Sequence, residues 1–140
     1  GLLIIIAGAL LDGLDGYLAR QSNEVSQRGG FLDSVLDRVA DAAFLIGLSL
    51  YFHDQGRPLW AGLTLAGLAG TFLVSYVRAK AEQSLAACEV GLGGERPDRL
   101  IALIISGLAG YLEVGILYVI VASWLTVARR FLYTWRELGK

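Results

Sequence analysis

The chain of 140 residues has the length of one domain, but 55% of its residues are hydrophobic and only 18% are charged. Globular domains in water average about 45–50% apolar and about 25% charged residues, so this composition excludes an ordinary water-soluble globule and a disordered chain. The net charge of −1 argues against a nucleic-acid-binding protein. The single cysteine excludes an internal disulfide framework.

Five apolar segments are candidates for membrane helices, which need about 20 residues to cross about 30 Å of hydrocarbon. They cover residues 1–22, 29–52, 58–85, 97–112 and 114–137, and only Glu113 and Gly115 mark the last break. The connections are short and no segment alternates like a strand, so the sequence predicts an all-α, polytopic membrane bundle of five helices in one domain, residues 1–140. The glycine-rich stretches GLTLAGLAG and SGLAGYL predict faces where such helices approach closely.

The basic residues predict the orientation of this bundle. All of them except Arg57 lie near the first connection, near the third connection or at the C-terminal end. Because positive charge collects on the cytoplasmic side of membrane proteins, we expect these connections to face the cytoplasm. The sequence therefore predicts an integral protein of the cell's inner or plasma membrane.

Four aspartates interrupt the first two apolar segments in pairs. Asp12 and Asp15 are three residues apart, and Asp33 and Asp37 are four apart, so each pair lies along one face of its own helix. Asp41 continues the second row, where it could support Asp37 or pair with a neighbouring arginine. Carboxylates within membrane helices are costly unless paired or hydrated, and oxygen ligands suit hard cations. The sequence therefore predicts one or two Mg²⁺ or Mn²⁺ ions, although the aspartates could also be solvated helix caps.

These aspartates belong to a longer pattern, DxxDGxxARx(8)GxxxDxxxD, which the sequence matches without departure at Asp12, Asp15, Gly16, Ala19, Arg20, Gly29, Asp33 and Asp37. On these residues the chain resembles the CDP-alcohol phosphatidyltransferase family. The resemblance implies that Asp12, Asp15, Asp33 and Asp37 hold two metal ions and that Asp37 is also the general base. It further implies a CDP-lipid site made by Asp12, Gly16, Ala19, Arg20 and Gly29. Tight helix packing would be the alternative role for the glycines and the alanine.

The family resemblance also sets expectations for the whole domain. Family members usually carry an amphipathic segment and one more membrane helix ahead of the motif. The resemblance therefore implies that this chain lacks both and that the intact domain has six membrane helices. Because members are commonly homodimers, we also expect a homodimer.

Two later segments bear on the acceptor. SYVRAKAE, residues 75–82, and GERPDRL, residues 94–100, bring basic residues to the side of the aspartates, which suits an acceptor that bears its own phosphate. Lipid headgroup binding is the alternative. Both segments resemble those of the inositol-phosphate branch of the family, with Arg78, Lys80 and Asp98 as conservative exchanges. This resemblance implies an acceptor-phosphate site of Ser75, Arg78, Arg96, Arg99 and Arg130, with Arg129 as the alternative to Arg130.

The resulting hypothesis is a transferase that moves a phosphatidyl group from CDP-diacylglycerol, or a CDP-ether lipid, to a hydroxyl of inositol phosphate and releases CMP. One alternative keeps the reaction and changes the acceptor to glycerol 3-phosphate, as in a phosphatidylglycerophosphate synthase. Another is a non-catalytic, ion-coupled membrane carrier. Such carriers often show paired repeats and broken helices, and neither is evident in this sequence.

Overall fold

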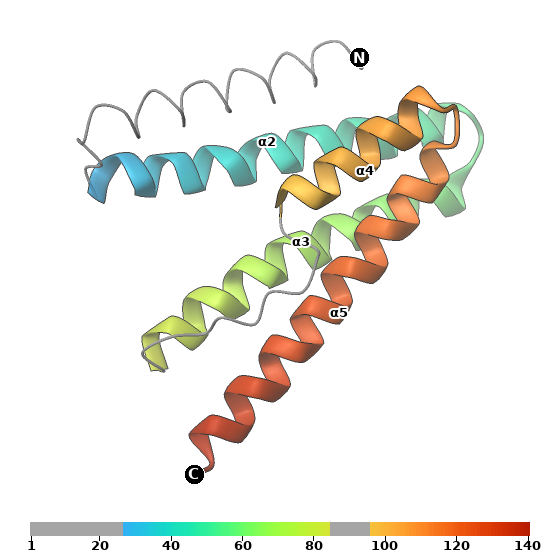
Figure 1. The fold of residues 1–140 in the computed structure, drawn as a ribbon. Helices are drawn as coiled ribbons and strands as arrows, with labels where there is room; N and C mark the ends of the chain where they lie inside the picture. The colour runs from blue at the N-terminus through green and yellow to red at the C-terminus, as the bar shows by residue number, and fades with distance from the viewer. Residues whose placement is uncertain (1–26, 85–95) are drawn as a thin grey trace. The chain divides into compact units, whose positions relative to one another are not determined.

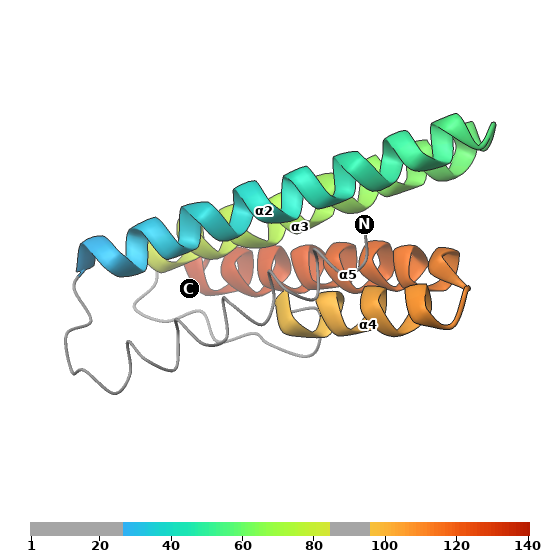
Figure 2. The same ribbon diagram turned by 90° about the horizontal axis from the view of Figure 1, so that it is seen from above.

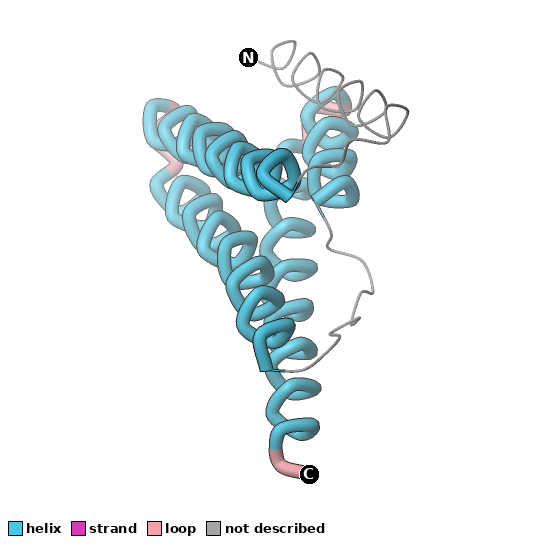
Figure 3. Tube along the Cα trace, turned by 90° about the vertical axis from the view of Figure 1, so that its left-hand side faces the viewer, coloured by secondary structure: helices cyan, strands magenta, loops and turns pink. Residues whose placement is uncertain are grey.

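The computed structural model describes residues 27–84 and 96–140, and its regular structure there is entirely helical (Figure 1). The helices are α2 (Gln27–Asp54), α3 (Pro58–Ser84), α4 (Arg96–Leu108) and α5 (Leu112–Leu138). The expected all-α fold is thus confirmed for the described part of the chain, in which the Cα trace shows only helices and loops (Figure 3). The first predicted segment, residues 1–22, lies outside the described residues.

Two of the described helices, α3 and α5, are long and apolar enough to cross a membrane. The α4 helix has 13 residues. At a rise of 1.5 Å per residue it is about 20 Å long, shorter than the hydrocarbon layer of about 30 Å. The structure therefore supports a membrane protein, while the predicted count of five spanning helices is not confirmed.

The chain forms two compact units, residues 1–44 and 45–140. In the second unit, α5 packs against both α3 and α4. The α3 and α5 helices run in the same direction, and α4 runs back along the first half of α5 (Figure 2). The α5 helix is therefore the central helix of this unit, because it contacts both of the other two.

Two glycines end helices in the left-handed backbone region, Gly56 after α2 with φ 69° and Gly110 after α4 with φ 78°. After α4, the Tyr111 amide donates to the Ser106 carbonyl at 2.8 Å, and the same pattern closes α2. This is the Schellman arrangement, which favours glycine because a Cβ is strained at such φ values. Both short connections are thus set by local backbone chemistry.

The turn between α4 and α5 lies a few residues before the predicted break. The α4 helix ends at Leu108, Gly110 turns the chain, and Glu113 already belongs to the first turn of α5. A carboxylate is favourable there because the first turn carries the positive end of the helix dipole. Glu113 therefore marks the start of a helix and not the gap between two helices.

Small residues let α5 approach α3 closely, as the GLTLAGLAG stretch predicts. A Cβ on Gly70 would lie 3.0 Å from the Ser123 Cβ and 3.1 Å from Nε1 of Trp124. That indole nitrogen donates to the Ala66 carbonyl at 3.1 Å. Gly62 of the same stretch faces open space. The close-approach prediction is confirmed for Gly70, whereas Gly110 of SGLAGYL serves as a turn residue.

Near its N-terminal end, α5 meets α4 at Gly115. A Cβ at this position would collide with Oγ of Ser106, and it would lie 3.2 Å from both the Ala102 carbonyl oxygen and the Leu103 Cα. Because two of these three atoms are backbone, side-chain rotation alone cannot make the room. The α4–α5 hairpin therefore depends on the absence of a side chain at Gly115.

Arg57 ties the connection between α2 and α3 to the start of α5. Its guanidinium forms an ion pair with Glu113, and it lies 5.2 Å from the ring centre of Phe52 and 5.6 Å from that of Trp60. Cations over aromatic faces gain about 0.5–1 kcal/mol at exposed sites. The one basic residue of this connection thus has a packing role.

We expect Gly115→Ala to destabilise the protein by about 1–3 kcal/mol, because the added methyl group overpacks the contact with α4. Gly62→Ala is the matched control. It also adds one methyl group within a helix but meets open space, so it should leave stability unchanged or raise it by up to about 1 kcal/mol. Thermal unfolding of the detergent-solubilised variants measures both. A Gly115→Ala protein as stable as the wild type would contradict the described packing.

Candidate active site

Asp33 and Asp37 both lie on α2, four residues apart, as their spacing predicts. Asp33 is exposed and Asp37 is half-buried, and Gly29 lies in the first turn of the same helix. The other predicted motif residues, Asp12, Asp15, Gly16, Ala19 and Arg20, lie outside the described residues. The described part of the motif is thus carried on a single helix.

Within residues 27–84 and 96–140, no three acidic, histidine or cysteine side chains gather as a metal site would require. The acidic side chains of α2 supply oxygen donors, which fit a hard divalent cation. A complete ligand set needs carboxylates from another part of the chain, and Asp12 and Asp15 are the predicted ones. The four-aspartate metal site therefore stays a prediction.

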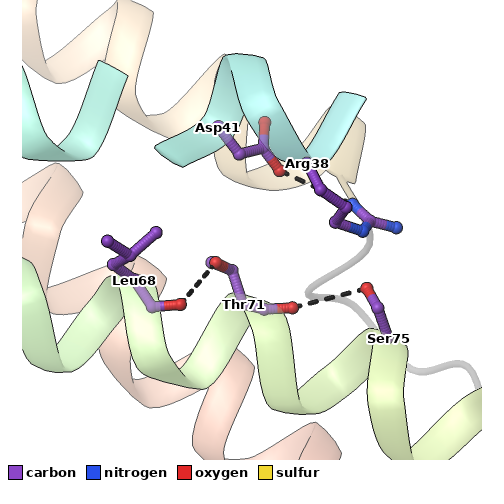
Figure 4. A network of polar contacts seen from close by, with 5 residues as sticks. All are labelled: Arg38, Asp41, Leu68, Thr71 and Ser75. Carbon is purple, nitrogen blue, oxygen red and sulfur yellow. Dashed lines mark hydrogen bonds and ion pairs between the residues drawn. The ribbon is translucent and has the colours of Figure 1, made fainter. Parts of the chain in front are cut away.

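Asp41 forms an ion pair with Arg38 on the same helix (Figure 4). The nitrogen–oxygen distance is 3.6 Å, and the Asp41 side chain is only 8% exposed. Of the two roles that the sequence left open for Asp41, pairing with a neighbouring arginine is the one that the structure shows. The spacing of three residues could have revealed Arg38 as the partner.

Two hydroxyl groups of α3, those of Thr71 and Ser75, donate hydrogen bonds to backbone carbonyls of the preceding turn (Figure 4). Thr71 donates to the Leu68 carbonyl at 2.8 Å, and Ser75 donates to the Thr71 carbonyl at 3.4 Å. A serine hydroxyl has one proton to donate, and at 3.4 Å the present hydrogen bond is long and weak. The half-buried Ser75 can therefore exchange this bond for one to a phosphate oxygen at little cost.

Arg130 brings α5 to the same turn of α3. Its guanidinium donates to the Val74 carbonyl at 3.2 Å, and the residue is 4% exposed. Arg129 is exposed. Of the two arginines that the sequence left open, Arg130 is thus the one that lies against α3. Its contact is with Val74, the residue directly before Ser75.

The remaining predicted acceptor residues lie on α3 and α4. Arg78 is exposed, and its Nε donates to Glu82 at 2.8 Å. Arg96 and Arg99 belong to the first turn of α4, where Arg99 is 4% exposed. All five predicted acceptor residues belong to the unit of residues 45–140.

Comparison with known proteins places the chain in a family. Residues 1–135 match the family model of the CDP-alcohol phosphatidyltransferases. The chain is 39% identical to the archaetidylinositol phosphate synthase of Pyrococcus horikoshii, over 91% of this chain and 65% of the relative. It is 40% identical to the phosphatidylinositol phosphate synthase of Cutibacterium acnes, over 85% of this chain and 64% of the relative.

A solved structure shows the same fold. The crystal structure of Mycobacterium tuberculosis phosphatidylinositol phosphate synthase with CDP-DAG bound matches with a TM-score of 0.80 and 32% identity, over 96% of this chain and 72% of that one. The chain thus spans slightly less than two thirds of the length of the Pyrococcus and Cutibacterium relatives. The family model, the relatives and the fold agree, and the chain belongs to the CDP-alcohol phosphatidyltransferase family.

Proposed function

We propose that this chain catalyses transfer of a phosphatidyl group from CDP-diacylglycerol, or a CDP-ether lipid, to a hydroxyl of inositol phosphate, with release of CMP. The family match over residues 1–135 supports the reaction. The relatives support the acceptor, since they are named as synthases of archaetidylinositol phosphate and phosphatidylinositol phosphate. The observation that carries the proposal within this structure is the contact of Arg130 with the turn of α3 beside Ser75.

In this proposal, the carboxylates of Asp12, Asp15, Asp33 and Asp37 hold two Mg²⁺ or Mn²⁺ ions. When bound, such ions neutralise charge on the diphosphate of the CDP-lipid. Asp37 takes the proton from the acceptor hydroxyl, whose oxygen then forms a bond to the lipid-bearing phosphorus. The bond from that phosphorus to the oxygen of CMP breaks, and CMP leaves.

The remaining motif residues have binding roles in this proposal. Arg20 binds phosphate oxygens of the CDP-lipid through charge-assisted hydrogen bonds. Gly16, Ala19 and Gly29 are small where the nucleotide comes close to the backbone. The lipid tails stay in the bilayer, so only the polar head needs a site within the protein.

The acceptor phosphate is bound by Ser75, Arg78, Arg96, Arg99 and Arg130. Arginine suits this task because its planar guanidinium donates several hydrogen bonds to phosphate oxygens in fixed geometry. These side chains recognise the phosphate and not the polyol, so glycerol 3-phosphate is the second candidate acceptor. The names of the relatives favour inositol phosphate, and membership of a transferase family argues against an ion-coupled carrier.

We further propose that the site faces the cytoplasm, because Arg78, Arg96, Arg99 and Arg130 lie toward the ends of their helices that the positive-inside rule assigns to that side. A homodimer within the membrane is the expected assembly.

Release of CMP from CDP-diacylglycerol by the reconstituted protein with Mg²⁺ tests the reaction and the acceptor. Parallel reactions contain inositol phosphate, glycerol 3-phosphate or no acceptor. We expect release with inositol phosphate alone. Release only with glycerol 3-phosphate would support the reaction but contradict inositol phosphate as the acceptor. If folded protein releases no CMP with any acceptor, the proposed function is wrong.

Asp37→Asn tests the base. The amide cannot take a proton, so we expect turnover to fall by at least about 100-fold, a typical contribution of general base catalysis. Binding of labelled CDP-diacylglycerol should remain detectable. Asp54→Asn is the matched control, because Asp54 is an exposed aspartate at the other end of α2 and should leave turnover unchanged. Full activity of Asp37→Asn would rule out the assignment.

A further inference from the structure

Arg78 and Glu82 form an ion pair at the C-terminal end of α3. The Nε of Arg78 lies 2.8 Å from Oε1 of Glu82, and the two side chains are 58% and 49% exposed. Lys80, which lies between them in the chain, donates to Gln83 at 3.3 Å instead. A residue assigned to acceptor-phosphate binding thus has a carboxylate as its neighbour.

Helix stability does not explain Glu82. The acidic residue follows the basic one by four positions, which is the less favourable order along a helix. Glu82 also lies in the last turn of α3, Pro58–Ser84, where the helix dipole favours cations, and that turn holds no basic residue. Ion pairs as exposed as this one contribute little to stability. The carboxylate therefore occupies a position that the helix itself disfavours.

We propose that Glu82 is a counter-anion that lowers the affinity of Arg78 for the phosphate of the acceptor. This inference rests on the proposed function, since it presupposes that Arg78 binds that phosphate. The carboxylate and the phosphate share one guanidinium and repel each other. Glu82 acts on the substrate only through Arg78 and through its charge, so it is not a catalytic residue.

Weaker phosphate binding has a use in this reaction. The product of transfer to inositol phosphate carries the same phosphate group as the acceptor. A site that binds this group tightly in substrate and product alike lowers KM without raising kcat, and it also slows release of the product. A carboxylate beside Arg78 weakens binding of the phosphate group in the substrate and in the product equally.

Coulomb's law gives the size of the effect. For a phosphate dianion about 6 Å from the carboxylate in water, the repulsion corresponds to about tenfold in affinity, and screening at physiological ionic strength reduces this to about threefold. The expected effect therefore lies within the range of steady-state kinetics, and it should shrink as salt increases.

Glu82→Gln tests the proposal, because glutamine keeps the oxygen that accepts the hydrogen bond from Arg78 and removes only the charge. We expect the KM for inositol phosphate to fall about threefold near physiological ionic strength, with no rise in kcat and no change in the KM for CDP-diacylglycerol. The difference from the wild type should become smaller at higher salt. Glu137→Gln is the matched control, because Glu137 forms an exposed ion pair with Lys140 at 2.6 Å and should change none of these constants.

Two outcomes would overturn the proposal. An unchanged KM for inositol phosphate would make the pair an ordinary surface contact. A higher KM would show that Glu82 supports phosphate binding by holding Arg78 in place.

Equilibrium binding of inorganic phosphate separates this proposal from the proposed function. The wild type and Glu82→Gln are compared without CDP-lipid, and the variant should bind phosphate about threefold more tightly at physiological ionic strength. If the wild type turns over no acceptor, the proposed function fails, while the phosphate comparison still tests the role of Glu82. Equal or weaker phosphate binding by Glu82→Gln would overturn the role of Glu82 alone.

Discussion

The close approach of α3 and α5 is the constraint on which the proposed acceptor-phosphate site depends. Membrane helices gain little hydrophobic energy by associating, so packing of small residues and interhelical hydrogen bonds hold them together. Gly70 leaves room for Ser123 and Trp124 of α5, and the indole of Trp124 donates to the Ala66 carbonyl. Further along the two helices, this packing allows the guanidinium of Arg130 to reach the Val74 carbonyl.

The residues proposed to carry out the reaction and the residues proposed to bind the acceptor belong to different parts of the chain. Every position of the aspartate motif falls within residues 1–44, and every proposed acceptor residue falls within residues 45–140. In the proposed function, this division would allow the acceptor residues to change while the motif and its reaction stay the same. In the proposed function, Arg130 and Glu82 act on the affinity for the acceptor phosphate, whereas Asp37 acts on the reaction itself.

The sequence predicted the helical class and the placement of most described helices, because long apolar runs and charged connections are read directly from residue order. It could not place the turn at Gly110, since a glycine in a left-handed turn and a glycine at a helix contact look alike in sequence. It favoured Arg130 but left Arg129 as an alternative, because that choice depends on the rotation of α5 against α3. The pairing of Arg78 with Glu82 was accessible from their spacing, but its meaning required knowing where α3 ends. The motif residues before Gln27 stay predictions.

The central claim is that the packing of α5 on α3 brings one particular arginine to the acceptor phosphate. Arg130→Gln and Arg129→Gln remove the same charge from adjacent positions, of which the first is buried against α3 and the second is exposed. The most direct measurement is the KM for inositol phosphate in these two variants, with the KM for CDP-diacylglycerol as the internal reference. We predict that Arg130→Gln raises the acceptor KM by at least about tenfold, as expected from the loss of a charged hydrogen bond, while Arg129→Gln stays near the wild type. Equal effects of the two variants, or a larger effect of Arg129→Gln, would contradict the account.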